Sequence, residues 1–242
     1  MAREGYRTIR GTIKYLSKQE ARYDEERGRE YFTLTQQCDG TDVLLAHCEI
    51  DDKPAVIRDV VQALDHKTSA PIDCSVRLTV GDRFEGSGWF RFRDSYVECE
   101  TFNQRDGRMT QRIEVDSPVQ WMQCHPISGD ALLMKLYDLS QGPGKQHFPN
   151  MMLSSPDHRG ATGPLAFPLG FSIVYVGEEE ITVEAGTFKA RHFQVTDTAG
   201  ELPEEHPPYN LWCTADDDYI ILRAGAEGYM KTHYELADLK IV

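Results

Sequence analysis

The sequence lacks an excess of positive charge. Its 242 residues include 26 Lys and Arg against 39 Asp and Glu, which gives a formal net charge of −13. Proteins that bind nucleic acids or anionic membrane surfaces present a basic face to them, and no basic patch occurs along this chain. The charge therefore argues against a nucleic-acid partner and against peripheral binding to an anionic membrane.

Long hydrophobic runs and paired cysteines are also missing. No run approaches the roughly 18 apolar residues of a membrane span. The six cysteines, at positions 38, 48, 74, 99, 124 and 213, include no CxxC pair, and their spacing suits neither a zinc site nor a compact disulfide scaffold. The N-terminal sequence MAREGYRTIRGTIKYL has no apolar signal-peptide core. We therefore expect free thiols, no membrane span and a cytoplasmic location.

Local motifs for metals and cofactors are absent as well. The eight histidines form no HxH, HxxxH or HExxH pattern, so the sequence has no local metal signature. No glycine-rich loop joins a strand to a helix in the manner of nucleotide-binding sites, and no Gly-x-Ser-x-Gly elbow occurs. The sequence thus predicts neither a cofactor nor a metal site.

The dominant positive signal is alternation of apolar and polar residues. Residues 30–50, 74–92 and 95–115 each read as a hairpin around a short turn that contains glycine. Alternation resumes after residue 170. Hairpins in series predict antiparallel meanders rather than βαβ units, and typical strand lengths suggest about ten or more strands. We expect a mainly β protein with a single domain over residues 1–242.

Residues 54–65 fit two interpretations. A Pro near the start and the spacing of Ile57, Val60 and Leu64 are typical of a helix. The same segment is rich in β-branched residues and lies between two hairpins, which favours a strand. We predict a strand here, with a helix as the alternative.

The pattern changes between the meanders predicted for residues 1–118 and 170–242. A short helix is predicted around residues 130–140, with Ser128 or Asp130 as its N-cap and Gly142 as its stop. Residues 142–169 are dense in Gly, Pro and Ser. A loop of this length in a compact domain is usually a lid or the wall of a pocket. Apolar residues recur along one face of the helix, at Leu132, Leu133, Leu136 and Leu139.

The C-terminal region carries a resemblance to a known family. A strand ends in the turn Ala185-Gly186-Thr187-Phe188, and a later strand pair holds Trp212, Asp216 and Asp217. Over residues 178–195 and 209–236 the chain resembles the uncharacterised bacterial family of domain of unknown function 3108. Many members of that family carry an export signal that this sequence lacks.

That resemblance implies a shape rather than a reaction. It implies a large curved antiparallel sheet, a half-barrel similar to periplasmic lipoprotein carriers, that wraps one short helix and leaves an apolar cavity. The family supplies no catalytic residues. A cavity with apolar walls and a few polar groups would suit an apolar small-molecule ligand.

Three polar side chains around the predicted helix are candidate catalytic residues. His125 could transfer a proton, Asp130 could orient its ring, and Tyr137 could polarise a substrate oxygen. Asp130 and Tyr137 lie two helical turns apart on one face. The alternative is structural, with Asp130 capping the helix, His125 bonded to a backbone carbonyl, and Tyr137 in the core.

Five further residues are candidate ligand contacts. His192 lies on a strand over residues 187–195, where it shares a face with Ala190 and Gln194. Periodicity leaves open whether this face or that of Phe193 lines the cavity. Aromatic side chains are predicted as cavity walls or ligand contacts at the remaining positions, namely Trp121, Trp212, His147 and Tyr209.

Three classes of function remain open from the sequence. The first is a protein that binds a hydrophobic small molecule between the sheet and the helix. The second is a cofactor-free lyase, isomerase or cyclase that uses His/Asp/Tyr acid–base chemistry in the same cavity. The third is a structural protein with a filled core.

Overall fold

The computed structural model describes residues 5–200, 206–226, 228 and 230–242. Within these residues, fifteen strands join into one sheet. The strands are β1 (Arg7–Ser17), β2 (Glu26–Gln36), β3 (Thr41–Ile50), β4 (Val56–Asp65), β5 (Pro71–Val80), β6 (Arg83–Phe92), β7 (Tyr96–Asn103), β8 (Gly107–Glu114), β9 (Trp121–Gln123), β10 (Gly144–Leu153), β11 (Phe167–Val183), β12 (Gly186–Gly200), β13 (Tyr209–Thr214), β14 (Ile221–Ala226) and β15 (Thr232–Ile241).

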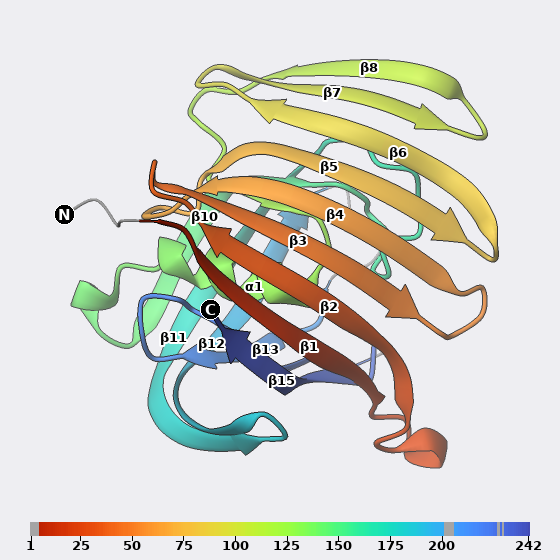
Figure 1. Ribbon diagram of the computed structural model, residues 1–242. Coiled ribbons are helices and arrows are strands. Elements are labelled where there is room, and N and C mark those ends of the chain that lie inside the picture. The colour runs from red at the N-terminus through yellow and green to blue at the C-terminus, as the bar shows by residue number, and fades with distance from the viewer. Residues whose placement is uncertain (1–4, 201–205, 227, 229) are drawn as a thin grey trace.

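The sheet order shows two meanders joined through the chain ends. The strand order is β8-β7-β6-β5-β4-β3-β2-β1-β15-β14-β13-β12-β11-β10-β9, and β1 pairs antiparallel with β15. Figure 1 shows β1 to β8 as a front layer, with β10 to β13 behind it and the helix between the two layers. The predicted mainly β, curved antiparallel architecture around one short helix is confirmed.

The sheet curls until one edge packs on its own inner face. A second, smaller cluster of buried residues joins side chains of β4 to β7, such as Phe90 and Val76, to Met122 of β9 and Met152 of β10. Bulges interrupt several ladders, including two along β11 where it pairs with β12. Bulges bend strands and increase their twist, which suits a sheet that must curve this far.

One strand pair departs from the antiparallel prediction. β9 and β10 are parallel, with Met122 opposite Met152. Parallel neighbours cannot be joined by a tight turn and need a crossover connection of a dozen or more residues. Residues 124–143 provide that crossover and contain all three helical segments between these strands. This parallel pair is an exception within the antiparallel sheet, and the crossover explains why a helix interrupts a chain of strands.

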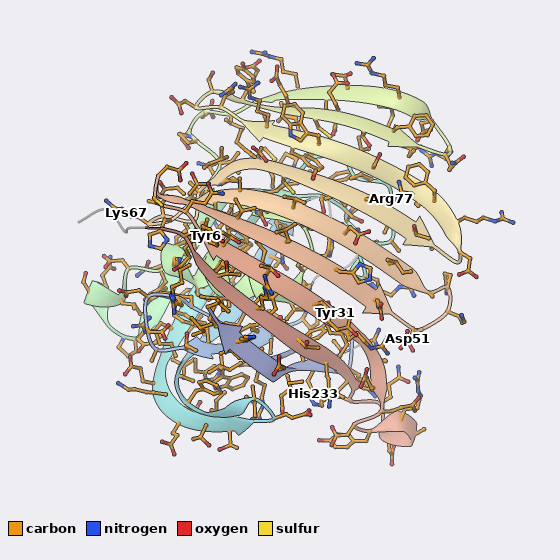
Figure 2. All side chains as sticks on the ribbon, in the orientation of Figure 1. Tyr6, Tyr31, Asp51, Lys67, Arg77 and His233 are labelled. Carbon is orange, nitrogen blue, oxygen red and sulfur yellow. The ribbon has the colours of Figure 1, made fainter. Side chains whose placement is uncertain are left out.

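The segment that fitted two interpretations is a strand. β4 buries alternate residues, so the period of two decides against the helix. Val56, Val60 and Leu64 face inward, and the polar Arg58 and Gln62 lie on the same buried face. The opposite face of the front layer is exposed, and Figure 2 shows Tyr31 and Arg77 on it.

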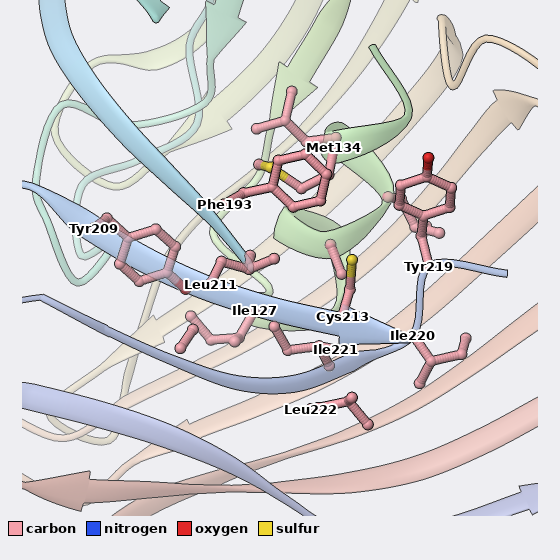
Figure 3. Packing of buried hydrophobic residues seen from close by; sticks show 14 of the residues in the cluster. Ile127, Met134, Phe193, Tyr209, Leu211, Cys213, Tyr219, Ile220, Ile221 and Leu222 are labelled. Carbon is pink, nitrogen blue, oxygen red and sulfur yellow. The ribbon is translucent and has the colours of Figure 1, made fainter. Parts of the chain in front are cut away.

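The helical region is shorter and more broken than predicted. α1 covers Ile127–Leu133, followed by two 3-10 turns, η2 (Met134–Leu136) and η3 (Leu139–Gln141). Figure 3 shows Ile127 and Met134 directed toward side chains of β12, β13 and β14. The predicted loop at residues 142–169 was also wrong in part, because β10 and the start of β11 occupy much of it.

The N-terminus of α1 is capped from a distant strand. The N-cap position is Pro126, which makes no side-chain cap, and the predicted caps Ser128 and Asp130 lie inside the helix. Glu30 of β2 supplies the acceptor instead. Its carboxylate accepts hydrogen bonds from the Ile127 and Ser128 backbone N–H groups at 2.7 and 3.0 Å.

Glu30 is fully buried, and its other contacts complete the cap. It also accepts hydrogen bonds from the Ser128 hydroxyl at 2.5 Å and the Tyr15 hydroxyl at 2.7 Å. Burial raises the pKa of Glu30 above its ordinary value, and these hydrogen bonds oppose that shift. One carboxyl group thus ties α1 to β1 and β2.

We predict that Glu30→Ala lowers the free energy of unfolding by about 3 kcal/mol, because it leaves buried donors of α1 and Tyr15 without an acceptor. Denaturant unfolding would measure the change. Glu26→Ala is the matched control, because Glu26 lies on the same strand in an exposed ion pair with Arg29 and should cost less than about 1 kcal/mol. Equal losses in the two variants would contradict this account of the cap.

Candidate functional site

A cavity of about 430 Å³ lies between the helical region and the sheet. Its apolar wall comes from α1, η2, β10, β11, β12 and the segment before β15, and consists of Ile127, Leu133, Met134, Leu153, Leu169, Phe171, Val195 and Met230. Polar side chains gather on the remaining wall and include Gln123, His125, Asp130, Ser155, Asp157, His158, Thr198, His206, Tyr209 and Tyr234. Small-molecule sites have this composition, with mostly apolar walls and a few polar groups.

Asp130 is the acidic group on α1 that faces this cavity. Tyr209 of β13 donates a hydrogen bond to its Oδ2 at 2.8 Å, and Gln123 of β9 donates to its Oδ1 at 2.5 Å. The Trp121 indole in turn donates to Gln123 at 3.3 Å. Burial raises the pKa of Asp130 to about 7, although the two hydrogen bonds favour the ionised form. Asp130 is therefore a carboxyl group poised between its two protonation states at neutral pH.

His125 lies on the same cavity wall but is not bonded to Asp130. It has a positive φ of 76° at the end of β9, a conformation that side-chain-bearing residues seldom adopt. Its Nε2 lies 3.0 Å from the Ser155 carbonyl oxygen, to which it donates a hydrogen bond. Burial, together with the positive charge of Arg58, lowers the pKa of His125 to about 3. The ring is thus neutral at physiological pH, and Asp130 does not orient it.

Tyr137 does not reach the cavity. α1 ends at Leu133 and the chain continues as a 3-10 turn, so the spacing that would place Tyr137 over Asp130 is lost. The Tyr137 hydroxyl donates to the Gly142 carbonyl oxygen at 2.8 Å, and its ring packs on Tyr175 and Phe193. The Tyr137 side chain therefore stabilises the crossover connection between β9 and β10.

The sequence left open which face of β12 lines the cavity, and in the structure it is the face of Phe193. Phe193 is fully buried and Val195 lines the cavity, so His192 projects from the other face. His192 stacks on Trp212 there, with ring centroids 4.1 Å apart, and bonds to Asn210 at 3.0 Å. The prediction that His192 and Trp212 border the cavity is therefore wrong, because both lie on the outer face.

The other predicted contacts divide between cavity and core. Tyr209 lines the cavity. His147 projects outward from β10, where its Nδ1 lies 3.2 Å from the Ser172 hydroxyl, and does not line the cavity. Trp121 is fully buried in the core beneath Gly129 of α1 and reaches the site only through Gln123.

The sequence reasoning missed several residues at the site. Gln123, Ser155 and Tyr234 line the cavity without any local motif that could have indicated them. Two buried charges, Glu30 and Arg58, did leave a signal. Each lies on the same face of its alternating strand as the neighbouring core residues. A charged residue on the otherwise apolar face of a strand is therefore the signal that could have identified both.

Among the described residues, no three His, Cys, Asp or Glu side chains are grouped so as to hold a metal ion. No described helix is long and apolar enough to cross a membrane. The six cysteines form no disulfide in the structure, and the Cys74 and Cys124 sulfur atoms lie 3.0 Å apart.

The fold belongs to the class of open, curved β-sheets that approach a barrel. The chain is similar to a β-barrel-like protein of domain of unknown function 1849 from Brucella abortus, with a TM-score of 0.60, 10% sequence identity and 98% of each chain covered. A candidate exported protein with a YmcC-like fold from Bacteroides fragilis matches with a TM-score of 0.32 and 8% identity, over 98% of this chain and 96% of that one.

No family model and no curated protein matches the chain. Membership of the family of domain of unknown function 3108 is therefore not shown. The coarser part of that resemblance, a curved β-sheet of the kind found in domains of unknown function, agrees with the first of these structures.

The raised pKa of Asp130 predicts a specific pH dependence of stability. An acid whose folded pKa exceeds its unfolded value ionises more readily when unfolded, so its contribution is complete below about pH 4 and is lost as pH rises toward about 7. The loss is on the order of 4 kcal/mol for a shift of this size. Asp130→Asn, which resembles the protonated carboxyl group, should remove it.

Thermal unfolding of the wild type and Asp130→Asn across this range would test the shift. The variant should gain stability relative to wild type as pH rises, with the difference levelling off above about pH 7. A difference that does not change with pH would show that Asp130 ionises normally.

Proposed function

We propose that this protein binds a hydrophobic small molecule in the cavity between the helical region and the curved sheet. The observation that supports the proposal is the cavity itself, about 430 Å³ of space beside an otherwise packed core. Protein interiors are normally close-packed, so a space of this size with an apolar wall is a feature that a binding site explains. Its volume lies within the range of small-molecule sites, roughly 300–1,000 Å³.

The proposal treats residues 1–242 as one domain in the cytoplasm. One continuous sheet joins both ends of the chain, which supports a single domain. The six free thiols support a reducing compartment. A structural protein with a filled core fits less well, because the cavity is not filled by side chains.

A pair of variants on β12 would test where the ligand binds. Val195→Trp places an indole in the cavity, whereas Gln194→Trp, one residue away, places the same group on the outer face. We expect the neutral fluorophore N-phenylnaphthylamine to bind the wild type and Gln194→Trp. Its affinity for Val195→Trp should fall by about tenfold or more, since the side chain occupies the ligand's volume.

Fluorescence titration gives the affinities, and thermal unfolding confirms that both variants fold. No binding to the folded wild type would contradict the proposal. Equal affinities of the two variants would place the probe outside the cavity and would contradict it as well.

Acid–base catalysis in the same cavity is the second candidate function. The observation that favours it is the pKa of about 7 at Asp130, which is near the optimum for a group that transfers protons at neutral pH. Asp130 and Tyr209 would then carry the proton transfer in place of the His125, Asp130 and Tyr137 set. Incorporation of solvent deuterium into a bound ligand, lost in Asp130→Asn, would identify an enzyme; a ligand that never exchanges would leave binding as the function.

A further inference from the structure

The strongest unexplained feature of the interior is the charge of Arg58. This side chain projects inward from β4 and is only 2% exposed. Its Nη1 makes two long hydrogen bonds, each 3.3 Å, to the Cys124 carbonyl oxygen and the Ser154 hydroxyl. Its Nε and Nη2 have no hydrogen-bond partner, and among the described residues no carboxylate forms an ion pair with it.

A buried guanidinium without a counter-ion is costly and rare. Buried charges in proteins are normally paired, because transfer out of water is expensive and only an opposite charge with good hydrogen bonds offsets it. Gln62 shows how a polar residue on the same strand face is normally accommodated, since its Nε2 donates to the Met122 carbonyl oxygen at 2.9 Å. Two of the three Arg58 side-chain nitrogens have no such acceptor.

The guanidinium borders a small recess beside the main cavity. The recess has a volume of about 50 Å³, and Arg58, Arg159, Tyr15 and Cys48 contribute to its walls. It shares four lining residues with the main cavity, namely His125, Ile127, His158 and Tyr234. A recess of this size, with a guanidinium in its wall, has room for a small head group or for water, next to the space available to an apolar chain.

The turn after β10 holds the guanidinium from the other side. Gly160 has a φ of +64°, and a Cβ atom there would lie 2.4 Å from Nη2 of Arg58. The nearest acidic residue on this turn is Asp157, whose Oδ1 accepts hydrogen bonds from the Arg159 and Ala161 backbone N–H groups at 2.9 and 3.0 Å. That carboxylate is used to form the turn, and its charge acts on Arg58 without an ion pair or hydrogen bond between them.

We propose that Arg58 binds the carboxylate of an amphipathic ligand, a long-chain organic acid whose alkyl chain lies in the main cavity. The inference rests on the proposed function, because the chain needs the apolar cavity. A guanidinium matches a planar carboxylate through two parallel N–H···O bonds, and the Arg58 Nε and Nη2 have no hydrogen-bond partner. Both atoms are covered in the free protein, so the guanidinium must shift toward the recess to meet the ligand. The ligand's carboxylate would neutralise this buried cation, which forms no ion pair with any described residue.

The test compares two ligands that differ only in the head group. Dodecanoate and dodecanol would each displace N-phenylnaphthylamine at about pH 8, where the acid is ionised. We expect the wild type to bind dodecanoate about tenfold or more tightly than dodecanol, since only the acid offers Arg58 a charged acceptor with two oxygens for paired hydrogen bonds. Arg58→Met should abolish this preference while leaving dodecanol affinity unchanged, and Arg58→Lys should retain part of it.

Stability of the free protein gives a second readout and a matched control. Arg58→Met should raise the melting temperature, because it removes an unpaired buried charge, whereas Gln62→Met should lower it without altering the ligand preference. A purely structural Arg58 would give the opposite result, with Arg58→Met less stable than wild type.

The outcomes separate this inference from the proposal on which it rests. Equal wild-type affinities for the acid and the alcohol, or a preference that persists in Arg58→Met, would overturn the carboxylate site and leave the hydrophobic cavity intact. Failure of both ligands and of the fluorophore to bind would overturn the cavity's function, and the inference with it.

Discussion

The buried carboxylate of Glu30 is the contact on which the arrangement of the site depends. It joins the N-terminus of α1 to the inner faces of β1 and β2, over a sequence separation of 97 residues from Ile127. A helix of seven residues has too few internal hydrogen bonds to be stable alone, so tertiary contacts must fix it. The cap fixes one end, and packing on β13 and β14 fixes its side.

The cavity follows from that fixed position. Because α1 is held at its N-terminus and the chain then turns through η2 and η3 to reach β10, the helix fills only part of the space inside the curled sheet. Leu133 and Met134 of the helical region and Phe171 and Val195 of the sheet line the remaining space. Residues 124–143 thus form the crossover between two parallel strands and also part of the wall of the cavity.

The electrostatics of the site are set mainly by burial. Burial raises the pKa of Asp130 to about 7 and lowers that of His125 to about 3, so both groups tend toward neutrality in the folded protein. Arg58 is the exception, because a guanidinium stays protonated in proteins even when burial lowers its pKa. The site thus combines a neutral imidazole at His125, a carboxyl group at Asp130 that is partly protonated at neutral pH, and the cation of Arg58, which suits a ligand that is largely apolar and carries a single negative charge.

The sequence predicted what local chemistry determines. Alternation and glycine turns indicated the hairpins and the mainly β class, and β-branched residues indicated that 56–65 is a strand. It placed Asp130 and His125 beside the cavity through their position around the helix. It could not place His192, because Phe188 and Phe193 point to opposite faces of one strand and periodicity alone does not say which is buried. The prediction that Tyr137 borders the cavity failed for a different reason, because the helix ends before it reaches this residue.

Local sequence patterns could not identify residues that act through long-range contacts. The Glu30 cap and the Arg58 recess each join segments more than sixty residues apart, and only the folded sheet brings them together. The most direct test of the whole account is an NMR titration of isotopically labelled protein with dodecanoate. The account predicts saturable shifts for Leu133, Phe171 and Val195 inside the sheet, with His192 and Trp212 on its outer face unaffected. Shifts confined to the outer face, or none at any ligand concentration, would contradict it.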